Sequence, residues 1–368
     1  MRLHFDQSIW MNLRLHRQVH APYCTRYTRG LESAFIMEPT MSAAQKAWLD
    51  LQYGLFIHFG PNTFAGAAWG DGAFPAADFA PGKLDCRQWA ELAAESGMKY
   101  AVLTSKHHDG FCLWPSELTD YSIKHSPSQR DVVAEFVEAC HEFGVKPGLY
   151  YSLWDKNCPF YEDDAAYAAY MRGQLHELLS NYGDIAELWF DGGWDKEHPT
   201  REWPYNPNWE HDSQIDPAVL RGSRWEWREL YHSIKKLQPN CVVLNNSGSD
   251  RPGVPRTFPL DARTSEHLEF IFQEKTYTAD LREVWSDDQG NEVFLPLEFC
   301  TSLNPDWFHI NRDYFLHPSA HTIAGWLQKA RAANANFLLN VGPNRDGLIP
   351  DYHRQFLLEA KKLAALIP

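Results

Sequence analysis

The sequence contains no C-x-x-C pair, no run of 18 apolar residues and no excess of basic side chains. Its seven cysteines are scattered and odd in number, so free buried thiols are predicted rather than a disulfide framework or a zinc ribbon. No membrane span is expected, and residues 1–40 lack the apolar centre of a signal peptide. These absences predict a protein of a reducing compartment, the cytoplasm.

Basic residues are also outnumbered, since 34 Lys and Arg stand against 48 Asp and Glu, for a formal net charge of −14. That charge repels phosphate backbones and anionic lipids, so neither nucleic acid nor a membrane is an expected partner. Aromatic residues are plentiful, at 14% of the chain. They indicate either a large core or a site that packs rings against the apolar faces of a sugar, and composition leaves both open.

The length of 368 residues suits a single α/β barrel. Residues 1–40 are rich in Arg and His without clear periodicity, which predicts an N-terminal extension, either disordered or a misassigned start. An ordinary N-terminal subdomain is the alternative. Ser42 followed by Gln45 is typical of a capped helix start, and we expect the barrel to occupy residues 41–368.

Short apolar runs alternate with amphipathic segments along the rest of the chain. The runs predicted as strands are 54–60, 100–108, 146–154, 184–193, 241–246, 297–303 and 336–343. Helices are predicted over 86–97, 131–144 and 163–182, each ending at or just before a glycine. This alternation, without a dinucleotide-binding glycine pattern, favours an α/β fold of the (β/α)8-like TIM barrel type, irregular or with fewer than eight helices.

Polar and aromatic side chains that can do chemistry stand at the downstream ends of the predicted strands. They are His58, His107, His108, Asp109, Tyr151, Trp154, Asp191, Asn245 and Asn246. In a barrel these ends meet at one mouth. Asp191 follows a buried run and precedes two glycines, which is typical of a nucleophile or base, although an Asp that caps the next loop is the alternative.

The histidines allow two interpretations. His58, His107 and Asp109 could hold a metal, as in a metal-dependent barrel hydrolase, but adjacent residues of one strand, such as His107 and His108, point to opposite faces. Neutral imidazoles that bind hydroxyl groups explain the same residues, so neither a metal nor a cofactor is expected.

Several motifs resemble glycoside hydrolase family 29, the retaining α-L-fucosidases, from about Trp48 to Ile349. They are GLFIHFGPNTF, AAWGDG, MKYAVLTSKHHDGFCLWPS, GLYYSLWD, ELWFDGGW and NFLLNVGPNRDGLIP. The WGDG and SKHHDGFCLWPS stretches look most like the branch acting on 1,3/1,4-linked fucose. The resemblance implies a TIM-barrel catalytic domain, here without the C-terminal β-sandwich that many members carry.

The resemblance also implies roles for single residues. Asp191 is similar to the family's nucleophile, while the implied substrate-binding residues are His58, Trp69, His107, His108, Tyr151, Trp189 and Trp307. For the acid/base, Thr-Ser-Glu266-His resembles the family segment that holds it in some members. Glu298 and Glu269 stay as alternatives.

Two departures from the family pattern weaken part of this transfer. Ala68 stands where many members have Glu, and Ser247-Gly248 replace an Arg-containing segment, for which Arg251 is a candidate substitute. The expected partners are α-L-fucosides, and the aromatic segment 201–209 is expected to pack either on a second copy of the chain or on the aglycone of the substrate. A fucose-binding protein without turnover is the non-enzymatic alternative.

Overall fold

The computed structural model divides the chain into Met1–Glu38 and Pro39–Pro368. The structure describes residues 39–67, 69–193, 223–246, 253–255, 257–266, 280–309 and 318–366, all in the second unit. The extension predicted for residues 1–40 therefore lies almost entirely outside the described residues. Within the described part of the chain, no helix is long and apolar enough to cross a membrane.

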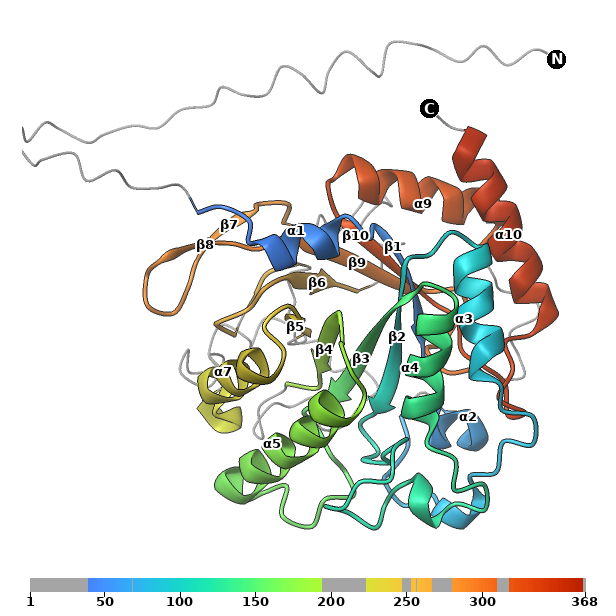
Figure 1. Cartoon of the computed structure of the whole chain (residues 1–368), viewed down its shortest axis with the longest axis vertical. Helices are drawn as coiled ribbons and strands as arrows, with labels where there is room; N and C mark the ends of the chain where they lie inside the picture. Colours follow the sequence, from blue (N-terminus) through green and yellow to red (C-terminus); the bar gives the residue numbers. More distant parts are fainter. Residues whose placement is uncertain are drawn as a thin grey trace, which may run out of the picture. The chain divides into compact units, whose positions relative to one another are not determined.

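The described strands form an eight-stranded parallel sheet in the order β5-β4-β3-β2-β1-β10-β9-β6 (Figure 1). Its strands are β1 (Tyr53–Ile57), β2 (Tyr100–Lys106), β3 (Lys146–Ser152), β4 (Glu187–Asp191), β5 (Val242–Asn246), β6 (Arg263–Ser265), β9 (Leu297–Ser302) and β10 (Asn336–Asn340). The backbone N–H of Asp261, just before β6, donates to Val243 O of β5 at 2.9 Å. The sheet therefore nearly closes, which confirms the predicted α/β barrel.

Helices surround the sheet, as Figure 1 shows. They are α2 (Pro61–Ala65), α3 (Cys86–Glu95), α4 (Val132–Glu142), α5 (Asp164–Asn181), α7 (Trp227–Leu237), α9 (Ala320–Ala332) and α10 (Asp351–Leu366), with short 3-10 turns η2 (Ala76–Asp78), η3 (Ile123–His125) and η6 (Ser223–Trp225). The glycines predicted to end α3, α4 and α5 all adopt positive φ, between 69° and 80°. Helix α1 (Ala43–Leu49) has the predicted capping box, in which Gln45 N donates to Ser42 Oγ at 3.2 Å.

Two strand predictions needed correction. The strand predicted over 100–108 ends at Lys106, so His107 and His108 lie in the following turn. Their side chains therefore need not point to opposite faces of the sheet. No strand is predicted between the runs 241–246 and 297–303, but this stretch contains β6 and an antiparallel hairpin of β7 (Val284–Ser286) and β8 (Glu292–Phe294). Strands of three residues are too short to carry a detectable alternation of apolar side chains.

The described part of the chain has two hydrophobic cores, one between the sheet and the helices and one inside the barrel, because successive side chains of each strand point to opposite faces. One face points outward to the helices, whereas the other fills the barrel with large rings, such as Phe56, Tyr100, Tyr150 and Trp189. Gly54 belongs to the inner face of β1, where an added Cβ would lie 2.5 Å from the Tyr100 ring. A glycine is therefore required there by the size of its neighbour.

Helix α1 lies across the end of the barrel where the strands begin (Figure 1). Its Trp48 enters the interior, and the indole N–H donates to Glu187 Oε2 at the start of β4. Glu298 lies beside Glu187 and accepts from Tyr100 Oη at 2.7 Å and from Trp189 Nε1 at 3.0 Å. We call Glu187 and Glu298 the floor pair.

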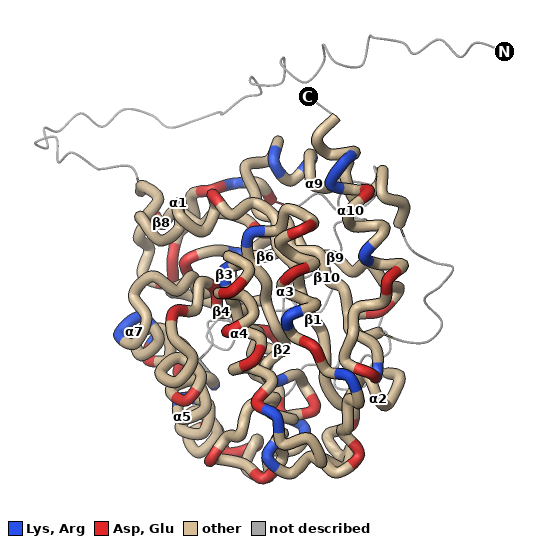
Figure 2. The backbone as a smooth tube through the Cα atoms, turned by 45° about the vertical axis from the view of Figure 1, so that its right-hand side comes forward, with Lys and Arg blue, Asp and Glu red and all other residues tan. Residues whose placement is uncertain are grey.

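Charged residues are dispersed over the outer surface of the barrel unit, and Figure 2 shows Lys and Arg positions interspersed with Asp and Glu. Ion pairs join neighbouring helices: Arg87 of α3 contacts Glu142 of α4, and Arg354 of α10 lies 2.5 Å from Glu95 of α3. Exposed pairs of this kind contribute about 0–1 kcal/mol each, so the barrel depends on its cores rather than on surface charge.

Candidate active site

Asp191 is the last residue of β4 and lies at the barrel mouth, only 7% exposed. Side chains alternate between the two faces of a strand, and Asp191 is two residues after the inward-facing Trp189. The Asp191 carboxylate therefore also faces inward, at the carboxyl end of the sheet. Tyr150 Oη donates to Asp191 Oδ2 at 2.8 Å, and Asn246 Nδ2 donates to Asp191 Oδ1 at 3.2 Å. These donors hold the carboxylate in one orientation, which is what a reacting oxygen requires.

A second carboxylate shares one of these donors. Asn246 Nδ2 also donates to Glu266 Oε1, at 2.8 Å, from the residue that follows β6. Because one amide nitrogen contacts both groups, the two carboxylate oxygens are at most about 6 Å apart. We call Asp191 and Glu266 the mouth pair. The short strand β6 brings Glu266 there.

Burial and charge act on Asp191 together. Burial raises the pKa of Asp191 to about 7, and the neighbouring Glu266 adds to this, while the hydrogen bonds from Tyr150, Gly192 N–H and Asn246 pull the pKa down. Asp191 therefore changes its charge near neutral pH, whereas an exposed Asp would be ionised throughout that range.

Three imidazoles line the same mouth. His107 and His108 have ring centroids 4.1 Å apart, and His58 lies 5.7 Å from His107. His108 Nε2 is 3.5 Å from Asp191 Oδ2. Burial lowers the pKa of His58 to about 3 and holds the pKa values of His107 and His108 well below their usual range, so all three rings are neutral at pH 7.

Aromatic side chains stand beside these imidazoles. Trp69 contacts His108 edge to face at 5.2 Å and Trp154 at 5.7 Å, while Trp307 lies 5.1 Å from the His58 ring. Trp69 and Trp307 are partly exposed, so they can offer apolar surface to a bound molecule. Of the predicted site residues, the structure thus brings together at the mouth Asp191, Glu266, His58, His107, His108, Trp69 and Trp307.

Tyr151 and Trp189 do not reach the mouth. Tyr151 faces the outer helices, where its Oη donates to Gln174 Oε1 at 2.6 Å, and its neighbour Tyr150 contacts Asp191 in its place. Trp189 lies one layer deeper, stacked under Tyr150 at 5.4 Å. The strand register pairs Tyr150 with Trp189, which places Tyr150 on the same inner face as Asp191, and the sequence alone does not give this register.

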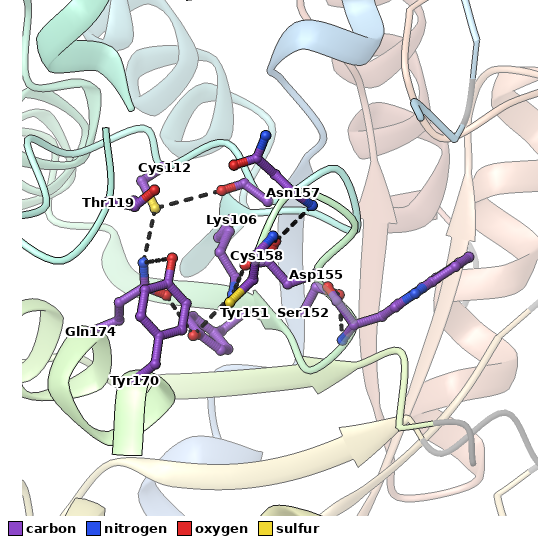
Figure 3. A network of polar contacts seen from close by, with 12 residues as sticks. Lys106, Cys112, Thr119, Tyr151, Ser152, Asp155, Asn157, Cys158, Tyr170 and Gln174 are labelled. Atoms are coloured by element: carbon purple, nitrogen blue, oxygen red, sulfur yellow. Dashed lines mark hydrogen bonds and ion pairs between the residues drawn. The ribbon is translucent and has the colours of Figure 1, made fainter. Parts of the chain in front are cut away.

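The buried side chain of Lys106 lies in a polar network with Asp155 and Tyr151 near the mouth (Figure 3). Lys106, the last residue of β2, forms an ion pair with Asp155 at 2.9 Å, and its Nζ donates to Tyr151 Oη at 3.0 Å. Burial is the largest single influence and lowers the pKa of Lys106, but the charge and hydrogen bond of Asp155 together with Tyr170 and Cys112 outweigh it, so the pKa is raised. Breaking such a pair costs about 3–5 kcal/mol, so it anchors the segment after β3 that carries Trp154.

Other predicted positions bear on the alternatives. Asp109 is buried, and its Oδ1 accepts from Phe111 N at 2.8 Å. Among the described residues, no three His, Cys, Asp or Glu side chains form a group that could hold a metal ion. Ala68, the segment 201–209, Ser247, Gly248, Arg251 and Glu269 lie outside the described residues. Within the described part, all six cysteines are free thiols and five are buried, as predicted.

A sequence model of the family described as alpha-L-fucosidase matches residues 73–363, which is most of the chain. The chain belongs to the alpha-L-fucosidase family. Alpha-L-fucosidase 1 of Arabidopsis thaliana is 32% identical over 329 residues, covering 88% of this chain and 60% of that protein. The resemblance inferred from the sequence motifs is therefore confirmed.

Solved structures of the alpha-L-fucosidase family have the same barrel. A glycoside hydrolase 29 family member from an unknown rumen bacterium superimposes with a TM-score of 0.69 at 31% identity, covering 88% of this chain and 57% of that one. Alpha-L-fucosidase isoenzyme 1 from Paenibacillus thiaminolyticus gives 0.65 at 30% identity, covering 87% and 76%. The chain spans about three fifths of the length of the plant relatives it matches.

Proposed function

We propose that this protein is a retaining exo-α-L-fucosidase that removes terminal α-L-fucose from oligosaccharides, with Asp191 as nucleophile and Glu266 as acid/base. The observation that carries the proposal is the mouth pair itself. One amide, Asn246 Nδ2, contacts both carboxylates, which limits the distance between their oxygens to about 6 Å, and the roughly 5–5.5 Å spacing that retaining glycosidases use lies within that limit.

In the first step, Asp191 attacks the anomeric carbon while protonated Glu266 donates its proton to the departing glycosidic oxygen. Tyr150 and Asn246 orient the attacking carboxylate. In the second step Glu266 takes a proton from water, the water attacks the anomeric carbon, and Asp191 leaves as a carboxylate. Configuration is retained because the anomeric carbon is inverted twice.

The walls of the site fit a deoxyhexose. Three neutral imidazoles can bind hydroxyl groups, and the rings of Trp69 and Trp307 offer apolar surface to the sugar's methyl group and C–H face. Preference for 1,3- or 1,4-linked fucose, a cytoplasmic location and a homo-oligomeric state stay predictions made from the sequence.

The nucleophile is tested by Asp191→Gly with an aryl α-L-fucoside as substrate. We expect kcat to fall by a factor on the order of 10⁴ or more, and added azide to restore turnover by attacking from the vacated side, giving a β-fucosyl azide. Parent-like activity of Asp191→Gly would exclude Asp191 as nucleophile. With the parent protein, proton NMR that shows β-fucose as the first product would exclude retention.

A metal-dependent hydrolase using His58, His107 and Asp109 is the alternative predicted from the sequence, although the described residues contain no group of three such side chains that could hold a metal ion. Dialysis against a chelator separates the two. A fucosidase built on the mouth pair keeps its activity, whereas loss of activity with a stoichiometric metal, restored on adding that metal back, would support the metal-dependent alternative.

A further inference from the structure

At the mouth, the Nδ1 atoms of two imidazoles are hydrogen-bonded to neighbouring side chains. The other hydrogen bonds of those side chains determine which ring nitrogen carries the proton. His58 Nδ1 is 2.8 Å from Asn340 Oδ1, and His108 Nδ1 is 2.6 Å from Ser152 Oγ. A neutral imidazole carries one proton, so the nitrogen that holds it fixes whether Nε2 donates or accepts.

The amide of Asn340 is fixed by two acceptors. Its Nδ2 donates to Trp307 O at 2.7 Å and to Ser302 Oγ at 2.8 Å, and a carbonyl oxygen can only accept. The Ser302 hydroxyl donates its own proton to Asp306 O at 2.8 Å, so Ser302 Oγ accepts from Asn340. Both amide protons are therefore used, Oδ1 must face His58, and the proton between them belongs to His58 Nδ1.

Ser152 acts on His108 by the same logic. The Ser152 hydroxyl has one proton, and Trp154 O lies 2.7 Å away as a pure acceptor. Ser152 Oγ also accepts from Trp154 N at 3.1 Å, so the loop after β3 fixes the direction of this hydroxyl. With the hydroxyl so directed, His108 Nδ1 donates to Ser152 Oγ, and Nε2 faces Asp191 Oδ2 at 3.5 Å. An unprotonated Nε2 is repelled by an ionised carboxylate, so this tautomer of the unliganded protein belongs to the state in which Asp191 carries its proton.

We propose that Asn340 and Ser152 are positioning residues that hold His58 and His108 in their Nδ1–H tautomers, so that both rings present Nε2 as an acceptor and select sugar hydroxyls that donate. The proposal rests on the proposed function for the identity of the ligand. Both rings are neutral because burial lowers their pKa values, so neither Nε2 carries a second proton. His107 is left out, because its Nδ1 lies 3.2 Å from Asn62 Nδ2, an amide nitrogen that donates, so this ring does not follow the Nδ1–H pattern.

The tautomers are measured directly by nitrogen NMR of the whole protein labelled with ¹⁵N-histidine, with the two rings assigned by loss of signal in His58→Gln and His108→Gln. We expect protonated Nδ1 and unprotonated Nε2 for both rings in the parent protein. Unprotonated Nδ1 in either ring would overturn the proposal for that ring, whatever the activity.

Ser152→Ala removes the hydroxyl that directs His108. We expect its signals to move toward a mixture of tautomers and kcat/KM on an aryl fucoside to fall about tenfold. Ser105→Ala is the matched control, because Ser105 is also buried and its hydroxyl donates to a strand carbonyl, Tyr150 O, at 2.6 Å. An unchanged His108 spectrum in Ser152→Ala would contradict the assignment.

Asn340→Leu removes the amide that directs His58, and Asn336→Leu, on the same strand, is its control. Asn336 also donates to a backbone carbonyl, Trp48 O at 3.0 Å, but lies at the opposite end of the strand. We expect only Asn340→Leu to change the His58 signals. If neither variant folds, the spectrum of the parent protein still decides the tautomer of His58.

Ligand selection is tested by calorimetric titration with L-fucose and its monofluoro and monodeoxy analogues, because fluorine can accept a hydrogen bond weakly but cannot donate one. At the hydroxyls that face His58 and His108, fluorine should weaken binding as much as removal of the hydroxyl, about tenfold. Fluoro analogues that all bind like L-fucose would overturn the selection. A parent protein that neither binds L-fucose nor cleaves fucosides would instead overturn the proposed function, while the NMR result would stand.

Discussion

Two carboxyl pairs face the inside of this barrel, one at each end of the sheet. The floor pair, Glu187 and Glu298, is fully buried, and the mouth pair consists of Asp191, 7% exposed, and the partly exposed Glu266. Aromatic side chains donate to the floor pair, a tyrosine and an amide donate to the mouth pair, and burial raises the pKa values of Glu187, Glu298 and Asp191.

The difference lies in what can reach the oxygens. At the floor, Trp48, Tyr100 and Trp189 bond the carboxyl oxygens and helix α1 covers the end of the barrel. At the mouth the donors are Tyr150 and Asn246, and the site opens beside Trp69 and Trp307. The same kind of group therefore supports the core at one end and is available for chemistry at the other.

The largest contrast is expected from removing one carboxylate of each pair. Glu266→Gln should lower kcat on a fucoside with a poor leaving group by about 10²–10⁴, because Gln cannot supply the proton, with little change in melting temperature. Glu298→Gln should lower stability by about 1–3 kcal/mol and change kcat less than tenfold. Kinetics and thermal unfolding of both variants check this, and the reverse pattern would make Glu298 the acid/base.

Removing the tyrosine hydroxyl that donates to each carboxyl pair should have a smaller effect on activity and stability than removing a carboxylate. Tyr150→Phe deletes a bond to the ionised form of Asp191, so the pKa of Asp191 should rise above about 7. Since Asp191 must be ionised to attack, the acidic limb of kcat/KM should move to higher pH. Tyr100→Phe, the floor counterpart, should leave that limb in place and lower the unfolding free energy; equal pH profiles for the two variants would contradict the contrast.

The smallest effect is expected in the pH dependence of stability. The folded floor pair has raised pKa values, to about 7 for Glu298, so the folded state binds more protons than the unfolded state above about pH 4.5. Stability should therefore fall as pH rises toward 7. Glu187→Gln cannot ionise and should flatten this slope in urea unfolding at several pH values, with Asp191→Asn measured alongside to subtract the mouth's share. A slope equal to that of the parent would show that Glu187 is not the titrating group.

Much of the architecture was predictable from local patterns. Seven strands, three helices with their glycine ends and the Ser42 capping box all lie where the apolar periodicity and end signals place them. The parallel order then brings the strand ends to one mouth, so Asp191 and His58 were found from the sequence. Strand β6 was missed because three residues carry too little pattern.

The roles of adjacent residues were harder to predict. Tyr150 and Tyr151 differ only in which face of β3 they occupy, and a strand read in isolation has no absolute inner face. Likewise Glu298 and Glu266 are both glutamates beside family-like motifs. The turn after β2 that brings His107 and His108 together also depends on where pairing with β3 stops.

By itself the sequence determined the alternation of strands and helices, and with it the barrel and the family, because apolar period and end signals act over a few neighbouring residues. Only the tertiary structure decided which side chains meet: Asn246 with Asp191 and Glu266, Tyr150 in place of Tyr151, and Glu298 sealed at the floor. These four contacts join residues up to 198 positions apart, as for Tyr100 and Glu298, and they follow from strand register and barrel closure, which no local pattern encodes.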